Sequence, residues 1–297
     1  MARLQFSLEQ IRSFLAVAQR EHVTRAAESV HLSQGAVTQQ LRLFERAVDL
    51  KLIDRVGRRV RLTSEGRAVA EACGAAMRAL QGIDDAARAA RGLEVGSLHV
   101  GASQTSAAYY LPGPLASFTA AHPRVHLSVV IGNTPEISRQ VAAGVLDCGL
   151  VEGTFSQAGL LDLAIAEDEV ILVAHPGHPL AGAAQLARGE LAAHRYLARH
   201  EGSGTESLAR EILGDAYEAV AKLHLGDLDV VRAATLGRLG FAALPRIAVA
   251  EELTAGRLVQ LAVPPRRRWI RAIRRPEAGP VLEGFWLQVA GRHRDAT

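Results

Sequence analysis

A run of small apolar residues, spaced alternately by four and three positions, fills residues 69–90. Its members are Val69, Cys73, Ala76, Leu80, Ile83, Ala87 and Ala90. This is the spacing of a helix that packs along another helix. Gly74 and Gly82 each cost about 1 kcal/mol relative to alanine in an isolated helix, so packing must hold it together. The pattern predicts a linker helix over residues 67–92 that forms a dimer. The alternative is a long helix packed on its own body.

Charge is distributed unevenly on the two sides of this predicted helix. Residues 1–92 contain 15 basic and 10 acidic residues, whereas residues 93–265 contain 11 basic and 18 acidic ones. Residues 266–297 are basic again, with 8 against 3. A basic head on an acidic body indicates two tasks, and the head is the part expected to face a polyanion.

The composition excludes several other classes of protein. With 297 residues, 48% of them hydrophobic and 22% charged, the chain is expected to fold into two or three compact units. No stretch approaches the roughly 18–20 apolar residues of a membrane helix, and the first residues lack the apolar block of a signal peptide. Two cysteines are too few for a disulfide framework or a thiolate zinc site. We therefore expect a soluble cytoplasmic protein with no cofactor and no bound metal.

The head reads as three helices. Apolar residues recur at helical spacing from Leu8 to Ala18, Thr24 is expected to cap a short second helix, and Ser33 a third helix over residues 34–48. One face of the third helix is apolar. The opposite face carries Gly35, Thr38, Gln39, Arg42 and Arg46. Two short helices joined by a brief turn, the second with a polar amide-rich face, predict a DNA-reading helix-turn-helix. The alternative is an ordinary amphipathic helix with a solvated face.

An arginine-rich hairpin is expected directly after these helices. Residues 52–53 and 60–62 read as two short strands around Gly57. The arginines of this segment are Arg55, Arg58, Arg59 and Arg61. A basic hairpin in this position is a wing that grips the DNA backbone beside the groove.

These residues resemble the N-terminal domain of LysR-type transcriptional regulators. The resemblance is carried by residues 14–18, 24–27 and 32–41 and by the later run from Arg55 to Gly66, in the family's order and spacing. Asp49 departs from it, since glycine usually ends the third helix. The resemblance implies a winged helix-turn-helix over residues 1–66 in which Ser33, Gln34, Thr38 and Gln39 contact bases. The full set of residues expected at DNA is Thr24, Arg25, Ser33, Gln34, Gly35, Thr38, Gln39, Arg42, Arg55, Arg58, Arg59 and Arg61.

The body, residues 93–297, alternates strands and helices, which predicts a mostly parallel α/β sheet. Expected strands include residues 98–101, 125–131, 146–151, 169–174 and 241–244, and Thr134 is expected to cap a helix. The family resemblance implies two α/β lobes as in periplasmic solute-binding proteins. Lobe I takes about residues 95–165 and 268–297, and lobe II about residues 166–267.

In such folds a ligand binds between the lobes, where strands end and helices begin. This rule selects hydroxyl, amide and carboxylate groups that follow predicted strands, together with a glycine-rich helix start. They are Ser103, Gln104, Thr105, Asn133, Thr134, Glu152, Gly202, Ser203, Gly204 and Thr205. Backbone amides and hydroxyls meeting in one cleft suit a small anion.

The sequence therefore predicts a DNA-binding regulator, α/β overall, controlled by an anionic effector. Its expected partners are promoter DNA, a second copy through the linker helix, and RNA polymerase if it activates. The family resemblance implies that two such dimers form a tetramer. One alternative is a constitutive DNA binder with a vestigial cleft, because Glu206, Asp227 and Arg238 depart from the family pattern. Another is an enzyme or transport-type binding protein, which needs neither head nor linker. The basic segment 266–275 is expected to be a solvated edge strand, with contact to DNA or an acidic subunit as alternatives.

Overall fold

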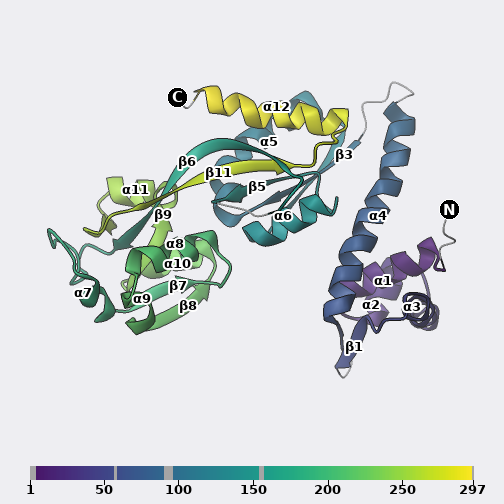
Figure 1. Ribbon diagram of the computed structural model, residues 1–297, viewed down its shortest axis with the longest axis horizontal. Helices are drawn as coiled ribbons and strands as arrows, with labels where there is room; N and C mark the ends of the chain where they lie inside the picture. The colour runs from purple at the N-terminus through teal and green to yellow at the C-terminus, as the bar shows by residue number, and fades with distance from the viewer. Residues whose placement is uncertain (1–4, 57–58, 90–95, 154–156, 296–297) are drawn as a thin grey trace. The chain divides into compact units, whose positions relative to one another are not determined.

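The computed structural model describes residues 5–56, 59–89, 96–153 and 157–295. The chain forms two compact units. One consists almost entirely of residues 1–91 and the other almost entirely of residues 92–297 (Figure 1). No helix in the described ranges is long and apolar enough to cross a membrane.

The first unit is a helical bundle followed by a hairpin and a long helix. Its elements are α1 (Leu8–Arg20), α2 (Val23–Ser29), α3 (Gln34–Val48), β1 (Ile53–Val56), β2 (Arg59–Leu62) and α4 (Ser64–Ala89). Ser33 caps α3 as predicted, since its hydroxyl accepts a hydrogen bond from the Ala36 amide at 3.1 Å. The prediction that Thr24 caps α2 is wrong, because α2 begins one residue earlier and His22 occupies the cap position.

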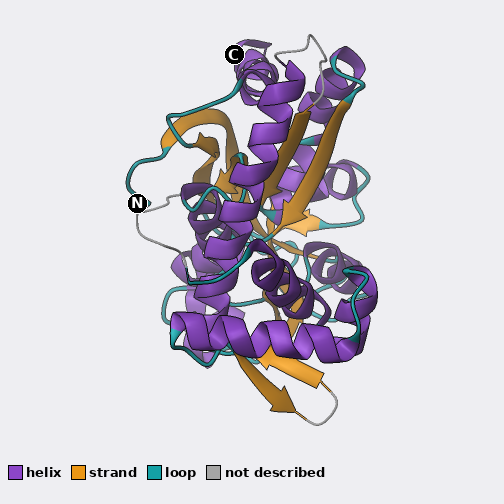
Figure 2. Cartoon of the chain, turned by 90° about the vertical axis from the view of Figure 1, so that its right-hand side faces the viewer, coloured by secondary structure: helices purple, strands orange, loops and turns teal. Residues whose placement is uncertain are grey.

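The hairpin β1–β2 is antiparallel, and its register pairs Ile53 with Leu62. In Figure 2 its two strands extend away from the helices of this unit. Val60 and Leu52 are buried in the same core as α1 and α3, so the base of the hairpin is anchored by apolar packing. The tip, which contains Gly57 and Arg58, lies outside the described residues.

The long helix α4 uses its apolar seam in two ways. Its first half packs on the core of its own unit, where Cys73 is buried and Val69 and Met77 are partly buried. Further along, Leu80 and Ile83 are 45% and 65% exposed. The sequence predicted one continuous dimer face, but only the later part of the seam is free of the first unit's core. Ala90 lies outside the described residues.

The second unit is built on one nine-stranded sheet. Its strands are β3 (Gly96–Ala102), β4 (Val125–Ile131), β5 (Cys148–Glu152), β6 (Leu161–Ala174), β7 (Tyr196–Arg199), β8 (Lys222–Gly226), β9 (Phe241–Pro245), β10 (Val259–Gln260) and β11 (Arg266–Arg274). The order is β4-β3-β5-β11-β6-β9-β7-β8, with β10 paired to β6. The prediction of a mostly parallel sheet fails in the middle of the sheet, because β11 runs antiparallel to both β5 and β6, and β6 runs antiparallel to β9.

Helices cover the two ends of this sheet and define two lobes. Lobe I holds η1 (Ser106–Tyr110), α5 (Pro112–Ala121), α6 (Thr134–Ala142) and α12 (Pro280–Asp295). Lobe II holds α7 (Arg188–Ala192), α8 (Gly204–Leu213), α9 (Ala216–Ala219), α10 (Leu228–Leu236), η2 (Arg246–Val249) and α11 (Ala250–Thr254). The long strands β6 and β11 run through both lobes (Figure 1).

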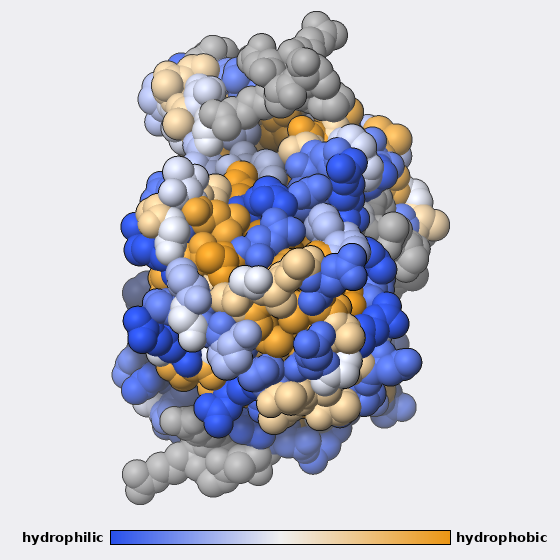
Figure 3. All heavy atoms as spheres, turned by 90° about the vertical axis from the view of Figure 1, so that its left-hand side faces the viewer, coloured by the Kyte–Doolittle hydropathy of each residue, from blue (hydrophilic) through white to orange (hydrophobic). Residues whose placement is uncertain are grey.

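Lobe II has a core on each face of the sheet. Val170 and Leu172 of β6 pack on one side, and Ile171 and Val173 pack on the other. A strand that is buried on both faces needs a continuous apolar run rather than alternation, which explains the sequence of this half of β6. Seen from the side of lobe II, hydrophobic residues appear among polar ones at the surface (Figure 3).

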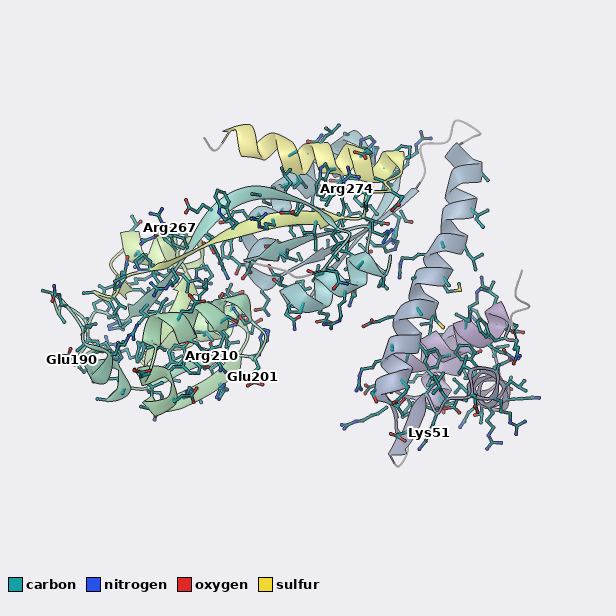
Figure 4. The ribbon with its side chains drawn as sticks, in the orientation of Figure 1. Lys51, Glu190, Glu201, Arg210, Arg267 and Arg274 are labelled. Carbon is teal, nitrogen blue, oxygen red and sulfur yellow. The ribbon has the colours of Figure 1, made fainter. Side chains whose placement is uncertain are left out.

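The basic segment 266–275 is not an edge strand, which corrects the prediction from sequence. β11 lies between β5 and β6, and β6 carries acidic residues that face its arginines. Arg271 pairs with Asp162, Arg267 with Glu167 and Glu169, and Arg268 with Asp168. Arg267 and Arg274 both project from this strand in Figure 4, and Arg274 pairs with Glu283 of α12 at 3.1 Å. Most arginines of the segment are thus paired with acidic residues of the chain, whereas Arg275 donates to the Val141 and Leu146 carbonyls.

Candidate functional site

The outward face of α3 forms a shallow open surface on the first unit. It is lined by Gln34, Gly35, Thr38, Gln39, Arg42, Leu43 and Arg46. These are the predicted outward residues together with Gln34 and Leu43, and Leu43 was not expected because leucine is usually assigned to the core. Thr38 donates its hydroxyl hydrogen to the Gln34 carbonyl at 2.9 Å, which fixes the side chain on this face.

The neighbouring helix orients one residue of this surface. Thr24 of α2 donates a hydrogen bond to Oε1 of Gln34 at 3.3 Å, so its role is to hold Gln34 rather than to cap a helix. Arg25 and Ser33 are exposed beside it, and so is Arg61 of the hairpin. The side chains of Arg55 and Arg59 lie outside the described residues, as does Arg58.

The second unit contains a cavity between its two lobes. It is lined by Ser103, Gln104, Thr105, Gly132, Asn133, Thr134, Glu152, Arg199, His200, Ser203, Gly204 and Thr205. All but one of the residues predicted for an effector are therefore brought together. The exception, Gly202, lies against the Asn133 side chain, and a Cβ there would come within 3.4 Å of Asn133 Nδ2. The cavity measures about 20 Å³.

On the lobe I side, hydroxyl groups hold Glu152 in place. Ser103 donates to Glu152 Oε1 at 2.8 Å. The Thr134 hydroxyl donates to the Glu152 carbonyl at 3.1 Å and accepts from the Glu152 amide at 3.2 Å. Thr134 therefore does not cap α6, which corrects the prediction. Asn133 caps α6 instead, since its Oδ1 accepts a hydrogen bond from the Glu136 amide at 2.8 Å.

Arg268 of β11 bonds to cavity-lining residues of both lobes. It pairs with Glu152 and with Asp168, and all three side chains are at least 95% buried. Its guanidinium also donates to Thr105 Oγ1 of lobe I at 3.3 Å and to Thr205 Oγ1 of lobe II at 3.2 Å. Burial raises the pKa of Asp168 even though the Arg268 charge acts in the opposite direction.

Lobe II contributes a second arginine that the sequence prediction missed. Arg199 is the last residue of β7 and is 3% exposed. Among the described residues it forms no ion pair, and burial lowers its pKa. Close by, the ten-residue helix α8 begins at Gly204 without a side-chain cap. The short run Tyr196–Ala198 was not recognised as a strand, and otherwise the rule that ligands meet strand ends would have selected Arg199.

Glycine at position 204 lets the lobes approach each other. A Cβ there would lie 3.3 Å from Glu152 Oε2 and 3.6 Å from Arg268 Nη1. A side chain at this position would therefore crowd Glu152 at the start of α8.

Two family models match the chain. Residues 8–67 match the model described as a bacterial regulatory helix-turn-helix protein, lysR family, and residues 91–293 match the LysR substrate binding domain.

Curated relatives match over most of their length. The RuBisCO operon transcriptional regulator of Allochromatium vinosum is 29% identical over 97% of this chain and 98% of its own. The protein of the same name from Acidithiobacillus ferrooxidans is 30% identical over 89% of this chain and 86% of its own. Among solved structures, full-length CbnR in complex with its target DNA has a TM-score of 0.66 at 22% identity and covers 97% of this chain and 100% of its own. That likeness shows that the fold is shared.

Proposed function

The chain belongs to the LysR family of DNA-binding transcriptional regulators, and from that membership we propose that its effector is a small anion, such as a carboxylate or a phosphate ester. The effector would bind in the cavity between lobes I and II. The first unit would bind promoter DNA through the α3 surface and the hairpin.

The observation that carries the anion proposal is the environment of Arg199. A buried guanidinium without a carboxylate partner is unfavourable unless strong acceptors surround it. Its present acceptors are two neutral oxygens, the Gly226 carbonyl at 2.9 Å and Oε1 of Gln104. The uncapped start of α8 adds backbone amides on the same cavity. Glu152, Asp227 and Glu206 act on Arg199 electrostatically, but none of them forms an ion pair with it, and Glu152 shares Arg268 with Asp168.

Binding would require the lobes to move. A volume of about 20 Å³ is on the scale of one water molecule. A carboxylate ligand is larger, so we propose that the anion binds when the two lobes lie further apart. A ligand that binds one lobe arrangement better than another shifts the population toward it.

We propose that this shift reaches DNA through pairs of chains. The exposed apolar part of α4 around Leu80 and Ile83 supports a dimer through the linker helix. Two first units would then bind successive major grooves, and their spacing would depend on lobe closure. A tetramer of two dimers, contact with RNA polymerase for an activator, and a cytoplasmic location complete the proposal.

Thermal unfolding with a panel of paired ligands tests the effector class. Each carboxylate or phosphate ester is compared with its uncharged amide or alcohol analogue, using the full chain. We expect at least one anion to raise Tm while its neutral analogue does not. Arg199→Met should remove the shift, and Arg195→Met, an exposed arginine of the same lobe, should preserve it. An equal shift in Arg199→Met would overturn the assignment.

The constitutive regulator with a vestigial cleft is favoured by one observation, the small volume of the cavity. It predicts that no ligand of the panel changes Tm and that the DNA footprint is identical with and without each ligand. The same titrations therefore decide between the two functions.

DNA binding by α3 is tested on fragmented genomic DNA at two salt concentrations. The upstream region of any RuBisCO operon is included, because two relatives are named RuBisCO operon transcriptional regulators. Arg42→Ala should weaken binding, and Arg195→Ala should not. A uniform loss with a salt slope smaller by about 1 identifies a phosphate contact. A loss confined to one base position identifies a base contact. Unchanged binding would remove Arg42 from the interface.

A further inference from the structure

The side chain of Gln104 crosses the cleft. Gln104 follows β3 in lobe I, and all its side-chain partners belong to lobe II. Its Oε1 accepts from Arg199 Nη2 at 2.5 Å and from the Leu228 amide at 3.2 Å, and its Nε2 donates to Asp227 Oδ2 at 3.0 Å. All three of these hydrogen bonds therefore join lobe I to lobe II.

The lobe II residues form a preformed receptor for this amide. Asp227 uses its other oxygen to cap α10, accepting from the Asp229 amide at 2.9 Å. Arg199 is held by its bond to the Gly226 carbonyl, and His200 contacts the same carbonyl oxygen at 2.9 Å. Gly226 has φ +73, a left-handed conformation that favours glycine. These hydrogen bonds within lobe II hold the end of β7 and the start of α10 in place without a contribution from Gln104.

We propose that Gln104 is a latch that closes the unliganded cleft by occupying Arg199, and that the anionic group of the effector displaces it. This inference rests on the anion site proposed above. A neutral amide oxygen is a weaker acceptor for a guanidinium than a carboxylate or phosphate oxygen, whose hydrogen bonds are roughly twice as strong. An anion therefore competes well for Arg199.

Displacement would also break the other two bonds. The bonds to Arg199, Asp227 and Leu228 all pass through one amide group, so moving Oε1 away from Arg199 also moves Nε2 away from Asp227. Occupation of Arg199 by an anion is thereby coupled to release of lobe I from the start of α10. Gln104 therefore couples the choice of ligand at Arg199 to the movement of the lobes.

Two variants should have opposite effects. Gln104→Ala removes the latch, so the unliganded lobes should separate, and an anion that binds the open state should bind on the order of tenfold more tightly. Gln104→Glu combined with Asp227→Asn allows the same contacts, with the direction of the hydrogen bond between positions 104 and 227 reversed, and turns the contact with Arg199 into an ion pair. That double variant should stay closed and should no longer respond to the anions of the panel.

The distance between the two lobes, measured without any ligand, shows whether Gln104 holds the cleft closed. Spin labels are placed at His126→Cys and His224→Cys, two exposed positions on the edge strands β4 and β8, in chains diluted with unlabelled protein. Cys73 and Cys148 are 7% and 1% exposed, so they should resist labelling. We expect a longer or broader distance distribution in Gln104→Ala, and an unchanged one in the double variant and in the control Gln185→Ala, an exposed glutamine of lobe II.

The outcomes separate this inference from the effector proposal. If Gln104→Ala leaves the distance distribution unchanged, or if the double variant opens, the latch is overturned, whatever the anions do. If Arg199→Met abolishes an anion's shift in Tm while Gln104→Ala changes neither distance nor affinity, the anion site stands alone. If Gln104→Ala opens the lobes and no anion raises Tm in any variant, the lobe contact stands, but displacement by an anion is overturned.

Discussion

At the scale of single residues, Gly66 occupies a position where no side chain fits. A Cβ on it would lie 2.0 Å from the Leu52 carbonyl oxygen. Its amide also donates to Thr63 Oγ1 at 2.9 Å, and the Thr63 hydroxyl donates to the Lys51 carbonyl at 2.8 Å. This glycine therefore joins the start of α4 to the segment between α3 and the hairpin.

We expect Gly66→Ala to destabilise the first unit by about 2 kcal/mol or more, because the backbone must move to relieve the clash. Gly82→Ala in the same helix is the matched control, since a Cβ there meets nothing within 4 Å. It should stabilise by up to about 1 kcal/mol. Urea unfolding of both variants gives the comparison, and equal stabilities would contradict the packing described for Gly66.

Residues also show where sequence reasoning succeeded and failed. Ser33 and the bounds of α3 were predicted because a helix cap and an apolar stripe are local signals. Thr24 and Thr134 were assigned as caps on the same local rule, yet their hydroxyls bond to Gln34 and to the Glu152 backbone. Those partners are 10 and 18 residues away, and residue type alone does not reveal a contact at that separation.

At the scale of elements, α4 packs in two directions. Cys73 faces the core of its own unit, whereas Leu80 and Ile83 present an apolar surface. A heptad pattern specifies which residues share a face but not which partner covers it. The seam was therefore predictable from sequence, and its division between two partners was not.

Leu80→Glu combined with Ile83→Glu should convert dimers to monomers, because charges on both chains would meet at the interface. Gly82→Glu, which lies off the seam, is the control and should leave the dimer intact. Sedimentation velocity on the full chain measures the association. A dimer that survives the double substitution would show that another surface holds the two chains together.

The strands β6 and β11 show a second limit of sequence reasoning. Acidic residues of β6 and arginines of β11 lie about 100 positions apart in the chain, for example Asp168 and Arg268. Each segment alone looks like a charged surface strand, and only their pairing in the sheet explains the charges. The pairing of Arg268 with the cavity residue Glu152 was missed for this reason.

At the scale of the whole molecule, the four tyrosines share one electrostatic property. Burial raises the pKa of Tyr109 and Tyr196, and it raises the pKa of Tyr110 and Tyr217 to about 12. The folded chain thus holds each phenol proton more tightly than the unfolded chain, in which the pKa is 10.0. This contribution to stability is complete below pH about 10 and is lost as the pH rises toward 12.

A spectrophotometric titration of tyrosinate absorbance measures this property. We expect less ionisation near pH 10 in the native chain than in the unfolded chain, followed by a steep rise toward pH 12 that coincides with loss of circular dichroism. In urea the same absorbance should rise around pH 10. A native tyrosine that titrates at its ordinary pKa would contradict the burial of that side chain.

Lobe I is made from both ends of the second unit, and this bears on how the chain is synthesised. Its core includes Leu282, Phe285 and Val289 of α12, and Phe285 packs edge-on against Phe118 of α5 at 5.4 Å. The ribosome therefore delivers all of lobe II before the first lobe can finish folding. Arg268 is translated about a hundred residues after Glu152 and Asp168, so neither acid can pair with this arginine before then.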